Sequence, residues 1–356
     1  MREYGSEFPI IECSDFYFDI VFADYNKVYL RSGREAIHAA LQNTDIKNEK
    51  IALLPAYCCH SMIAPFISEG WRIEFYRLNA GLSVDEDYMK YAISKYIPSV
   101  VLVMNYFGYA STNSIVKYIK SINSSICCIE DFSHCLFSFE AVMSSQADFY
   151  VASIRKSVGV PDGGIIVSKH KLNRLNPIAA KNVFTTLRQQ AMKSIEVYQS
   201  TGDVEVKQDF RLKLIEARRE LNTYTELIAM TDDSKKRLDS INVGNIAQRR
   251  KNNYKHLLSL IVRCKGLRLI NTEDVPEVYV PFSLPILVEN RDRVQKLFAQ
   301  NGLYAPLLWP LTDKAKEVCY ISAEMEAKML ALPIDQRYVY EDIECIGRII
   351  NNICKE

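Results

Sequence analysis

Two short apolar runs lead into side chains that can do chemistry. Residues 126–129 precede Asp131, and residues 149–154 precede Lys156, which lies 25 positions after Asp131. A lysine amine can form a Schiff base with a cofactor aldehyde, and a carboxylate can keep a pyridine nitrogen protonated, so that the ring acts as an electron sink. An acid at the end of one strand and a lysine at the end of another are therefore one arrangement that a pyridoxal phosphate (PLP) enzyme needs.

Both residues also have ordinary structural interpretations. Asp131 is a favoured helix N-cap type, and Lys156 could be one of many solvated lysines. The spacing of the pair by itself does not choose between these interpretations and a catalytic one.

Three motifs in this part of the chain carry a family resemblance. They are I-E-D-F-S-H at 129–134, S-I-R-K at 153–156 and G-V-P-D-G-G at 159–164. In this order they resemble the cofactor region of the DegT/DnrJ/StrS family of fold-type-I sugar aminotransferases, in the branch with R-K-x-x-G-V-P-D-G-G as lysine segment. The resemblance extends from G-S-E-F at 5–8 to L-P-I-D-Q-R-Y at 332–338, and it is weakest between about 172 and 230.

The resemblance assigns roles to residues around the two motifs. It implies that Lys156 holds the cofactor and moves protons, and that Asp131 stabilises the pyridinium. His134 matches a position beside the cofactor's phenolic oxygen, although a histidine here could be a core residue. Ser153 matches a phosphate contact, although it could equally bond to the backbone. We interpret Asp162 as structural, in a turn whose glycines allow positive φ.

Residues 32–34 open a predicted helix that runs to about residue 41. Ser32 with Glu35 three residues on is a capping-box pattern. The free N–H groups and positive dipole end of such a helix also form an anion site. The resemblance implies that Ser32, Gly33 and Arg34 receive the PLP phosphate here, and the two interpretations are compatible.

The turn after residue 55 departs from the family pattern. Family members place a flat side chain over the cofactor ring here, and the aligned residue in this chain is Cys59. A thiol offers much less contact area than an aromatic ring. Tyr57 or His60 could supply the stacking instead.

Composition indicates an ordinary globular protein. The 356 residues are 48% hydrophobic and 24% charged, and the net charge of +1 suggests neither nucleic acid nor an acidic membrane as partner. No apolar run approaches a membrane span, and the first residues lack the apolar core of a signal peptide, so we expect a cytoplasmic protein. The ten cysteines include no C-x-x-C pair, so we expect reduced thiols and no metal site.

Alternating strand and helix patterns predict an α/β fold with a mostly parallel mixed sheet. Strands are expected at 51–55, 72–76, 99–104 and 165–168, with a helix at 61–69 and short strands before residue 30. We expect a fold-type-I aminotransferase-like large domain at 1–240, with a helical excursion at about 180–240. A small α+β C-terminal domain at 241–356 should follow, with strands at 278–281 and 284–288 and a helix at 291–301.

The resemblance implies an aminotransferase. The amino donor would be glutamate, and the acceptor would be a keto group of a nucleotide-linked sugar, as in surface-polysaccharide or related sugar biosynthesis. Two alternatives stay open: an enzyme of the same fold that acts on a non-sugar keto substrate, and a catalytically degenerate homologue that serves as a binding partner. The presence of Lys156 argues against the family's dehydratases, in which histidine replaces the lysine.

The resemblance also implies a homodimer with shared active sites. The 180–240 segment is long, polar on one face and nearly free of glycine and proline, so it needs something besides its own domain to pack on. A closed two-fold arrangement is the commonest soluble oligomer.

Overall fold

The computed structural model describes residues 3–11, 24–46, 49–109, 112–179, 181–222, 226–261, 263–270 and 275–355. Cys13 and most of the segment predicted to hold short strands before residue 30 lie outside these ranges. The chain divides into two compact units. The first unit contains Ser6–Asp45 and Asp148–Val243, and the second contains Glu3–Gly5, Ile46–Ala147 and Gly244–Glu356. The predicted division into domains at 1–240 and 241–356 stays a prediction.

The first unit is built around three antiparallel strands. Strand β7 pairs with both β1 and β6, with Leu30 opposite Gly164 and Ala152 opposite Ile165. Helix α1 packs against β6 and β7. The elements of this unit are β1 (Asn26–Leu30), α1 (Gly33–Asn43), β6 (Phe149–Ala152), the short 3-10 helix Ile154–Lys156, β7 (Gly164–Ser168), α6 (Val183–Thr201), α7 (Val204–Glu220) and α8 (Asp232–Asp239).

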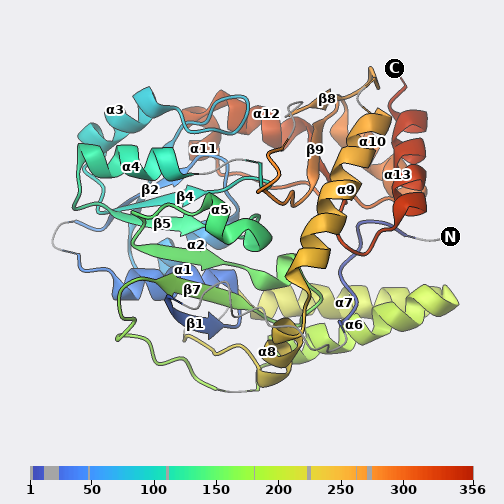
Figure 1. Cartoon of the computed structure of the whole chain (residues 1–356), viewed down its shortest axis with the longest axis horizontal. Coiled ribbons are helices and arrows are strands. Elements are labelled where there is room, and N and C mark those ends of the chain that lie inside the picture. The colour runs from blue at the N-terminus through green and yellow to red at the C-terminus, as the bar shows by residue number, and fades with distance from the viewer. Residues whose placement is uncertain are drawn as a thin grey trace. The chain divides into compact units, whose positions relative to one another are not determined.

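Helices α6 and α7 form a long hairpin, which Figure 1 shows as two helices side by side. Gly202 ends α6 with a φ of 70°, and the Asp203 carboxylate caps α7 by accepting the Glu205 N–H at 2.8 Å. Together with α8, the hairpin makes the described part of 180–240 mostly helical, and its status as an excursion from the large domain stays a prediction. Several large apolar side chains on it are exposed, among them Val197 at 49% and Leu212 at 66%.

The second unit contains four parallel strands in the order β3-β2-β4-β5. Every residue of β2 and β4 is buried, as expected for strands covered on both faces. This arrangement confirms the parallel strand–helix alternation predicted from the sequence. The elements up to residue 147 are β2 (Ile51–Pro55), α2 (His60–Ser68), β3 (Arg72–Tyr76), α3 (Glu86–Tyr96), β4 (Val100–Met104), α4 (Asn113–Ile122), β5 (Cys127–Asp131), the 3-10 helix Leu136–Ser138 and α5 (Phe139–Val142).

The rest of the second unit packs helices on a small antiparallel sheet, β8-β9-β10. Its core includes Tyr254, Leu257, Phe298 and Ile346. Strand β9 and helix α10 confirm the predictions at 284–288 and 291–301. The elements are α9 (Val243–Ile261), β8 (Arg268–Leu269), β9 (Leu284–Leu287), α10 (Arg291–Gln300), α11 (Asp313–Val318), α12 (Tyr320–Lys328), β10 (Met329–Leu332) and α13 (Tyr340–Ile353).

The strand predicted at 278–281 is wrong. This segment contains a turn and no strand pairing, and Pro281 has no N–H to offer a sheet. Val280 donates its N–H to the Ser138 hydroxyl at 3.3 Å, and its carbonyl lies against Gly108. Val280 is buried by packing on the loops after β4 and β5 and not by membership of a sheet, whereas Val278 is 62% exposed.

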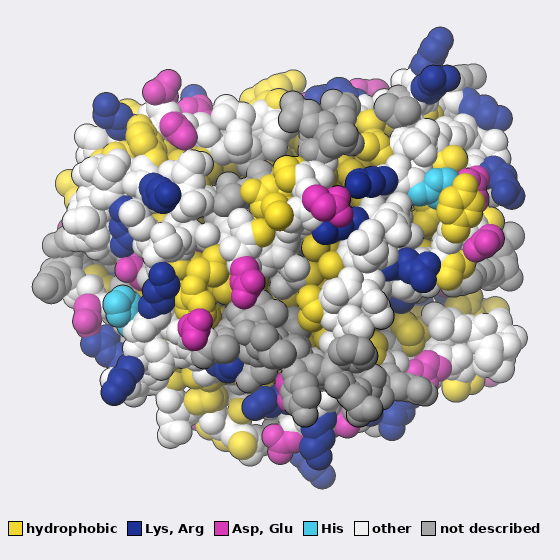
Figure 2. Space-filling view, viewed as in Figure 1, with side chains coloured by type: hydrophobic (Ala, Val, Ile, Leu, Met, Phe, Trp, Pro, Cys, Tyr) yellow, Lys and Arg dark blue, Asp and Glu magenta, His cyan; other side chains and the backbone are white. Residues whose placement is uncertain are grey.

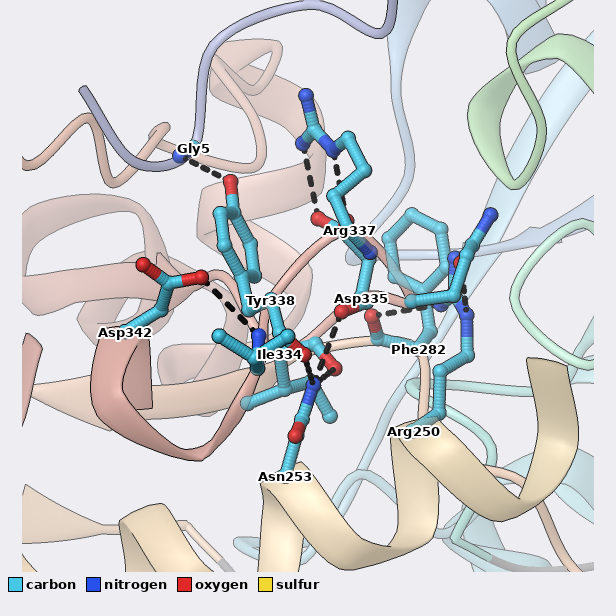
Figure 3. Close-up of polar contacts among 11 residues, drawn as sticks. Gly5, Arg250, Asn253, Phe282, Ile334, Asp335, Arg337, Tyr338 and Asp342 are labelled. Atoms are coloured by element: carbon cyan, nitrogen blue, oxygen red, sulfur yellow. Dashed lines mark hydrogen bonds and ion pairs between the residues drawn. The ribbon is translucent and has the colours of Figure 1, made fainter. Parts of the chain in front are cut away.

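The family-like segments at the two ends of the chain meet in the second unit (Figure 3). The Asn253 amide on α9 donates to the carbonyls of Asp335 at 3.0 Å and Tyr338 at 3.1 Å. Arg337 forms a two-pronged ion pair with Asp335, with distances of 2.7 and 2.9 Å. The Tyr338 hydroxyl accepts the Gly5 N–H at 2.6 Å. These motifs therefore have a structural role, joining both chain ends to α9.

The face drawn in Figure 2 carries basic and acidic side chains interspersed, and neither sign dominates it. Within the described ranges, every helix is either too short or too polar to cross a bilayer.

Candidate active site

Lys156 lies in the first unit on the 3-10 turn that follows β6, a strand that ends two residues earlier than the apolar run 149–154 suggests. The Ile154 N–H donates to the Gly163 carbonyl at 3.0 Å, and the Gly163 N–H donates to the Arg31 carbonyl at 2.8 Å. Gly163 has a φ of 145°, which other residues rarely adopt. These bonds hold the lysine turn against the segment that leads into α1.

The N-terminus of α1 lies directly against Ser153. A Cβ atom on Gly33 would lie 2.8 Å from the Ser153 Cβ, and one on Gly164 would overlap the Ser32 carbonyl. Only glycine fits at these two positions without a shift. The first amides of a helix have no intrahelical partner, and the helix dipole makes this end positive. Ser32, Gly33, Arg34 and Ser153 are here called the α1 cradle, and a helix N-terminus of this kind can attract an anion.

The side chains of Ser32 and Arg34 are used within the fold. The Ser32 hydroxyl accepts the Glu35 N–H at 3.3 Å and donates to the Glu35 carboxylate at 2.8 Å. That carboxylate also pairs with Arg31 at 3.1 Å. The Ser32 N-cap is therefore confirmed, but the Glu35 carboxylate bonds to the Ser32 hydroxyl and to Arg31 where a full capping box would have it accept the Ser32 N–H. Arg34 donates to the Leu221 carbonyl at 2.8 Å. An anion in the cradle would therefore meet backbone amides and Ser153.

Asp131 is the last residue of β5 in the second unit and is 4% exposed. Its carboxylate accepts the Ser133 N–H at 2.8 Å, and its carbonyl accepts the Asn105 N–H at 3.1 Å. These bonds fix the carboxylate at the C-terminal end of a parallel strand, the edge at which open α/β sheets bind ligands.

The neighbouring acid, Glu130, has a different environment. It accepts hydrogen bonds from the Asn105 amide at 2.8 Å, the Ser144 N–H at 2.9 Å and the Thr112 hydroxyl. Burial raises the pKa of Glu130, although these three hydrogen bonds oppose the rise. Because adjacent strand residues point to opposite faces, the structure separates a buried structural acid from Asp131.

His134 lies in an aromatic cluster of the second unit. Its Nδ1 accepts the Phe107 N–H at 3.4 Å, which leaves the proton of the neutral ring on Nε2. The ring stacks on Phe282 with centroids 4.2 Å apart and planes 5° apart, and Trp309 lies 5.7 Å away. The orientation of His134 is therefore set by packing as well as by a hydrogen bond.

The three candidates for stacking on a cofactor ring differ in exposure. Tyr57 is fully buried, with Tyr106 at 5.8 Å and Trp309 at 5.2 Å between ring centroids. His60 is exposed, and Cys59 is half-buried as the N-cap of α2. Tyr57 is thus part of the interior, and Cys59 stays a predicted contact for a cofactor ring.

Sequence reasoning missed Phe282 and Trp309. Trp309 is one of only two tryptophans and stands in the segment L-L-W-P, but nothing in the sequence connects it with His134, 175 positions earlier.

Among the described residues, no group of three or more His, Cys, Asp or Glu is placed to hold a metal ion, and the nine described cysteines are free thiols.

No protein-family profile matches the sequence, and no curated protein matches it. Solved structures do match. The sugar aminotransferase CalS13 from Micromonospora echinospora gives a TM-score of 0.64 at 12% identity, over 94% of this chain and 90% of that one. A DegT DnrJ EryC1 StrS aminotransferase from Brucella abortus gives 0.66 at 11% identity, over 95% and 88%. S. venezuelae DesV, solved in complex with a ketimine intermediate, gives 0.67 at 13% identity, over 95% and 87%.

At this level of identity the likeness concerns the fold. It confirms the predicted α/β, fold-type-I aminotransferase-like class. The Brucella abortus structure bears the name of the family whose motifs this sequence resembles.

Proposed function

We propose that this chain is a PLP-dependent aminotransferase that moves an amino group from glutamate to the keto group of a nucleotide-linked sugar. The observation that carries the proposal is the α1 cradle, with Lys156 three residues after Ser153. An anion site and a lysine amine in this proximity match a cofactor that has both a phosphate and an aldehyde. The fold shared with CalS13 and DesV supports the same conclusion.

The first unit supplies the groups that hold the cofactor. The missing side chain of Gly33 lets the start of α1 pack directly against Ser153, which brings the first amides of this helix beside the Ser153 side chain. Backbone amides of residues 32–34 and the Ser153 hydroxyl would bind that phosphate. When bound, PLP supplies the electron sink that acidifies the donor's Cα–H. The Lys156 amine would hold the cofactor through its aldehyde and, when free, would accept the proton of the donor's Cα–H as general base.

The family resemblance implies roles toward the cofactor ring for three residues of the second unit. The Asp131 carboxylate would accept a hydrogen bond from the protonated pyridine nitrogen, and its negative charge would keep that nitrogen protonated. His134, with its proton on Nε2, can donate a hydrogen bond to the phenolic oxygen. Cys59 would contact the ring face. We expect Asp131 to contribute mainly to rate and the α1 cradle mainly to affinity.

We further propose a cytoplasmic homodimer whose active sites are shared between subunits. The α6–α7 hairpin supports this proposal, because Val197, Val204, Leu212 and Ile215 are each about half exposed or more on it. Apolar side chains gathered on one hairpin favour burial against a second surface.

Borohydride reduction of the protein with PLP, followed by peptide mapping, tests the cofactor assignment. We expect the pyridoxyl label on Lys156 and its loss in Lys156→Arg. Release of 2-oxoglutarate from glutamate, with a panel of nucleotide-linked keto sugars, tests the acceptor. Label on another lysine would refute the site, and turnover with non-sugar keto acids alone would replace the sugar acceptor. Label on Lys156 without turnover of any acceptor would favour the degenerate-homologue alternative.

A further inference from the structure

Three arginines surround one aromatic ring in the first unit. The guanidinium carbons of Arg31, Arg155 and Arg188 lie 5.8, 5.8 and 5.9 Å from the centroid of the Phe184 ring. Arg31 directly precedes the α1 cradle, and Arg155 belongs to the lysine turn. These four residues, here called the Phe184 cluster, therefore gather positive charge beside the proposed cofactor phosphate.

Two of the three arginines are each paired with an acid. Arg31 pairs with Glu35 at 3.1 Å. Arg188 pairs with Glu7 at 3.3 Å and donates to the Pro161 carbonyl at 2.7 Å. Both of these guanidinium groups are thus engaged by carboxylates of the same unit.

Arg155 is different. It has no hydrogen-bond or ion-pair partner among the residues that the structure describes, and its Nε is buried without one. Burial lowers the pKa of Arg155 to about 10, and the nearby Arg188 adds to the effect. A buried cation normally has a partner, because an unpaired one costs desolvation energy that nothing offsets. Arg155 as a whole is half-buried, and the Glu7 carboxylate that pairs with Arg188 also attracts it, so its charge is only partly compensated in the protein without ligand.

We propose that Arg155 supplies, within the same chain, the positive charge that balances the cofactor's phosphate at the α1 cradle. This inference rests on the proposed function. A phosphate monoester carries a charge of about −1.5 to −2 at neutral pH, whereas a helix N-terminus offers only about half a positive charge. Because the Coulomb interaction in a partly buried site falls only as the inverse of distance, Arg155 acts without touching the phosphate. The Phe184 ring lies against its guanidinium group.

Comparison of PLP with pyridoxal, which keeps the ring and aldehyde but lacks the phosphate, tests the proposal. Dissociation constants are measured by absorbance titration of the full-length apoprotein. In Arg155→Met we expect PLP to bind at least roughly tenfold more weakly, while pyridoxal changes by less than about twofold. Arg155→Lys keeps the charge and should retain most of the affinity for PLP. Arg211→Met, on the exposed surface of α7, is the matched control and should change neither.

The stability of the apoprotein provides a second readout, because Arg155→Met should weaken PLP binding without lowering stability. Because no carboxylate of the described residues forms an ion pair with Arg155, we expect the urea midpoint of Arg155→Met to equal or exceed that of the wild type, whereas a merely structural arginine would lower it. Equal weakening of PLP and pyridoxal, or no change in either, would overturn the inference while leaving the proposed function intact. If the wild type binds neither aldehyde, the proposed function fails and the inference fails with it.

Discussion

Asp162 connects the end of the lysine turn to two helices, and its removal should destabilise the first unit. The side chain is fully buried. One carboxylate oxygen accepts the Thr185 hydroxyl and the Thr231 N–H, both at 3.1 Å, and the other accepts the Thr231 hydroxyl at 3.0 Å. Thr185 lies in the first turn of α6 and Thr231 is the N-cap of α8. Asp162→Ala would leave three donors without their acceptor.

The expected cost follows from those three bonds. A buried polar group left without a partner costs about 1–3 kcal/mol, so with partial relaxation we expect a loss of roughly 3–5 kcal/mol. For 356 residues at about 2.1 cal/mol/K of unfolding entropy per residue, this corresponds to a decrease in Tm of roughly 4–7 °C. Asp162→Asn keeps one oxygen for the two 3.1 Å bonds and removes the buried charge, so it should cost about 1 kcal/mol or less.

Urea denaturation followed by fluorescence measures both variants, with the exposed Asp232→Ala as control. Burial raises the pKa of Asp162, although hydrogen bonds from Ser234 and Thr231 oppose the rise. A raised folded-state pKa means that its contribution to stability is present below the unfolded pKa and is lost as pH rises through the folded pKa. The free energy of unfolding of the wild type, relative to that of Asp162→Asn, should therefore increase as pH falls from 7 toward 4. An alanine variant as stable as the wild type, or an asparagine variant as unstable as the alanine one, would refute the reasoning.

Three further predictions concern activity and assembly. Asp131→Asn should retain PLP but lose roughly 10²–10⁴ in turnover, and near-normal kcat would mean that another acid pairs with the pyridine nitrogen. Gly33→Ala should weaken PLP binding by roughly tenfold or more, because its Cβ would lie 2.8 Å from the Ser153 Cβ, whereas Gly81→Ala, with open space around it, should bind PLP like the wild type. Analytical ultracentrifugation should give a dimer at micromolar concentration, and a monomer with full activity would contradict the shared active site.

Much of the local structure could be predicted from the sequence because it depends on neighbouring residues. The continuous apolar runs at 51–55 and 99–104 predicted strands, and every residue of β2 and β4 is buried. Ser32 was predicted as an N-cap, and its hydroxyl accepts the Glu35 N–H as expected. Hydrophobic runs and caps act over a few residues, so short sequence patterns suffice to predict them.

The tertiary structure decided what depends on contacts between distant segments. Glu130 and Asp131 are adjacent acids in the sequence, and only the positions of Asn105, Thr112 and Ser144 show that Glu130 is the buried structural one. The segment at 278–281 looks like a strand by composition, but packing against Gly108 excludes it from the sheet.

The same reason explains why the sequence could not indicate the role of Arg155. Its position before Lys156 is plain, but whether a guanidinium is paired depends on which acids the fold brings near it. Glu7 is 148 positions away from Arg155 and pairs with Arg188, while Glu35 pairs with Arg31. Ion pairs in a protein interior depend on the tertiary structure, because a carboxylate pairs with the arginines that lie near it in space, whatever their separation in the sequence.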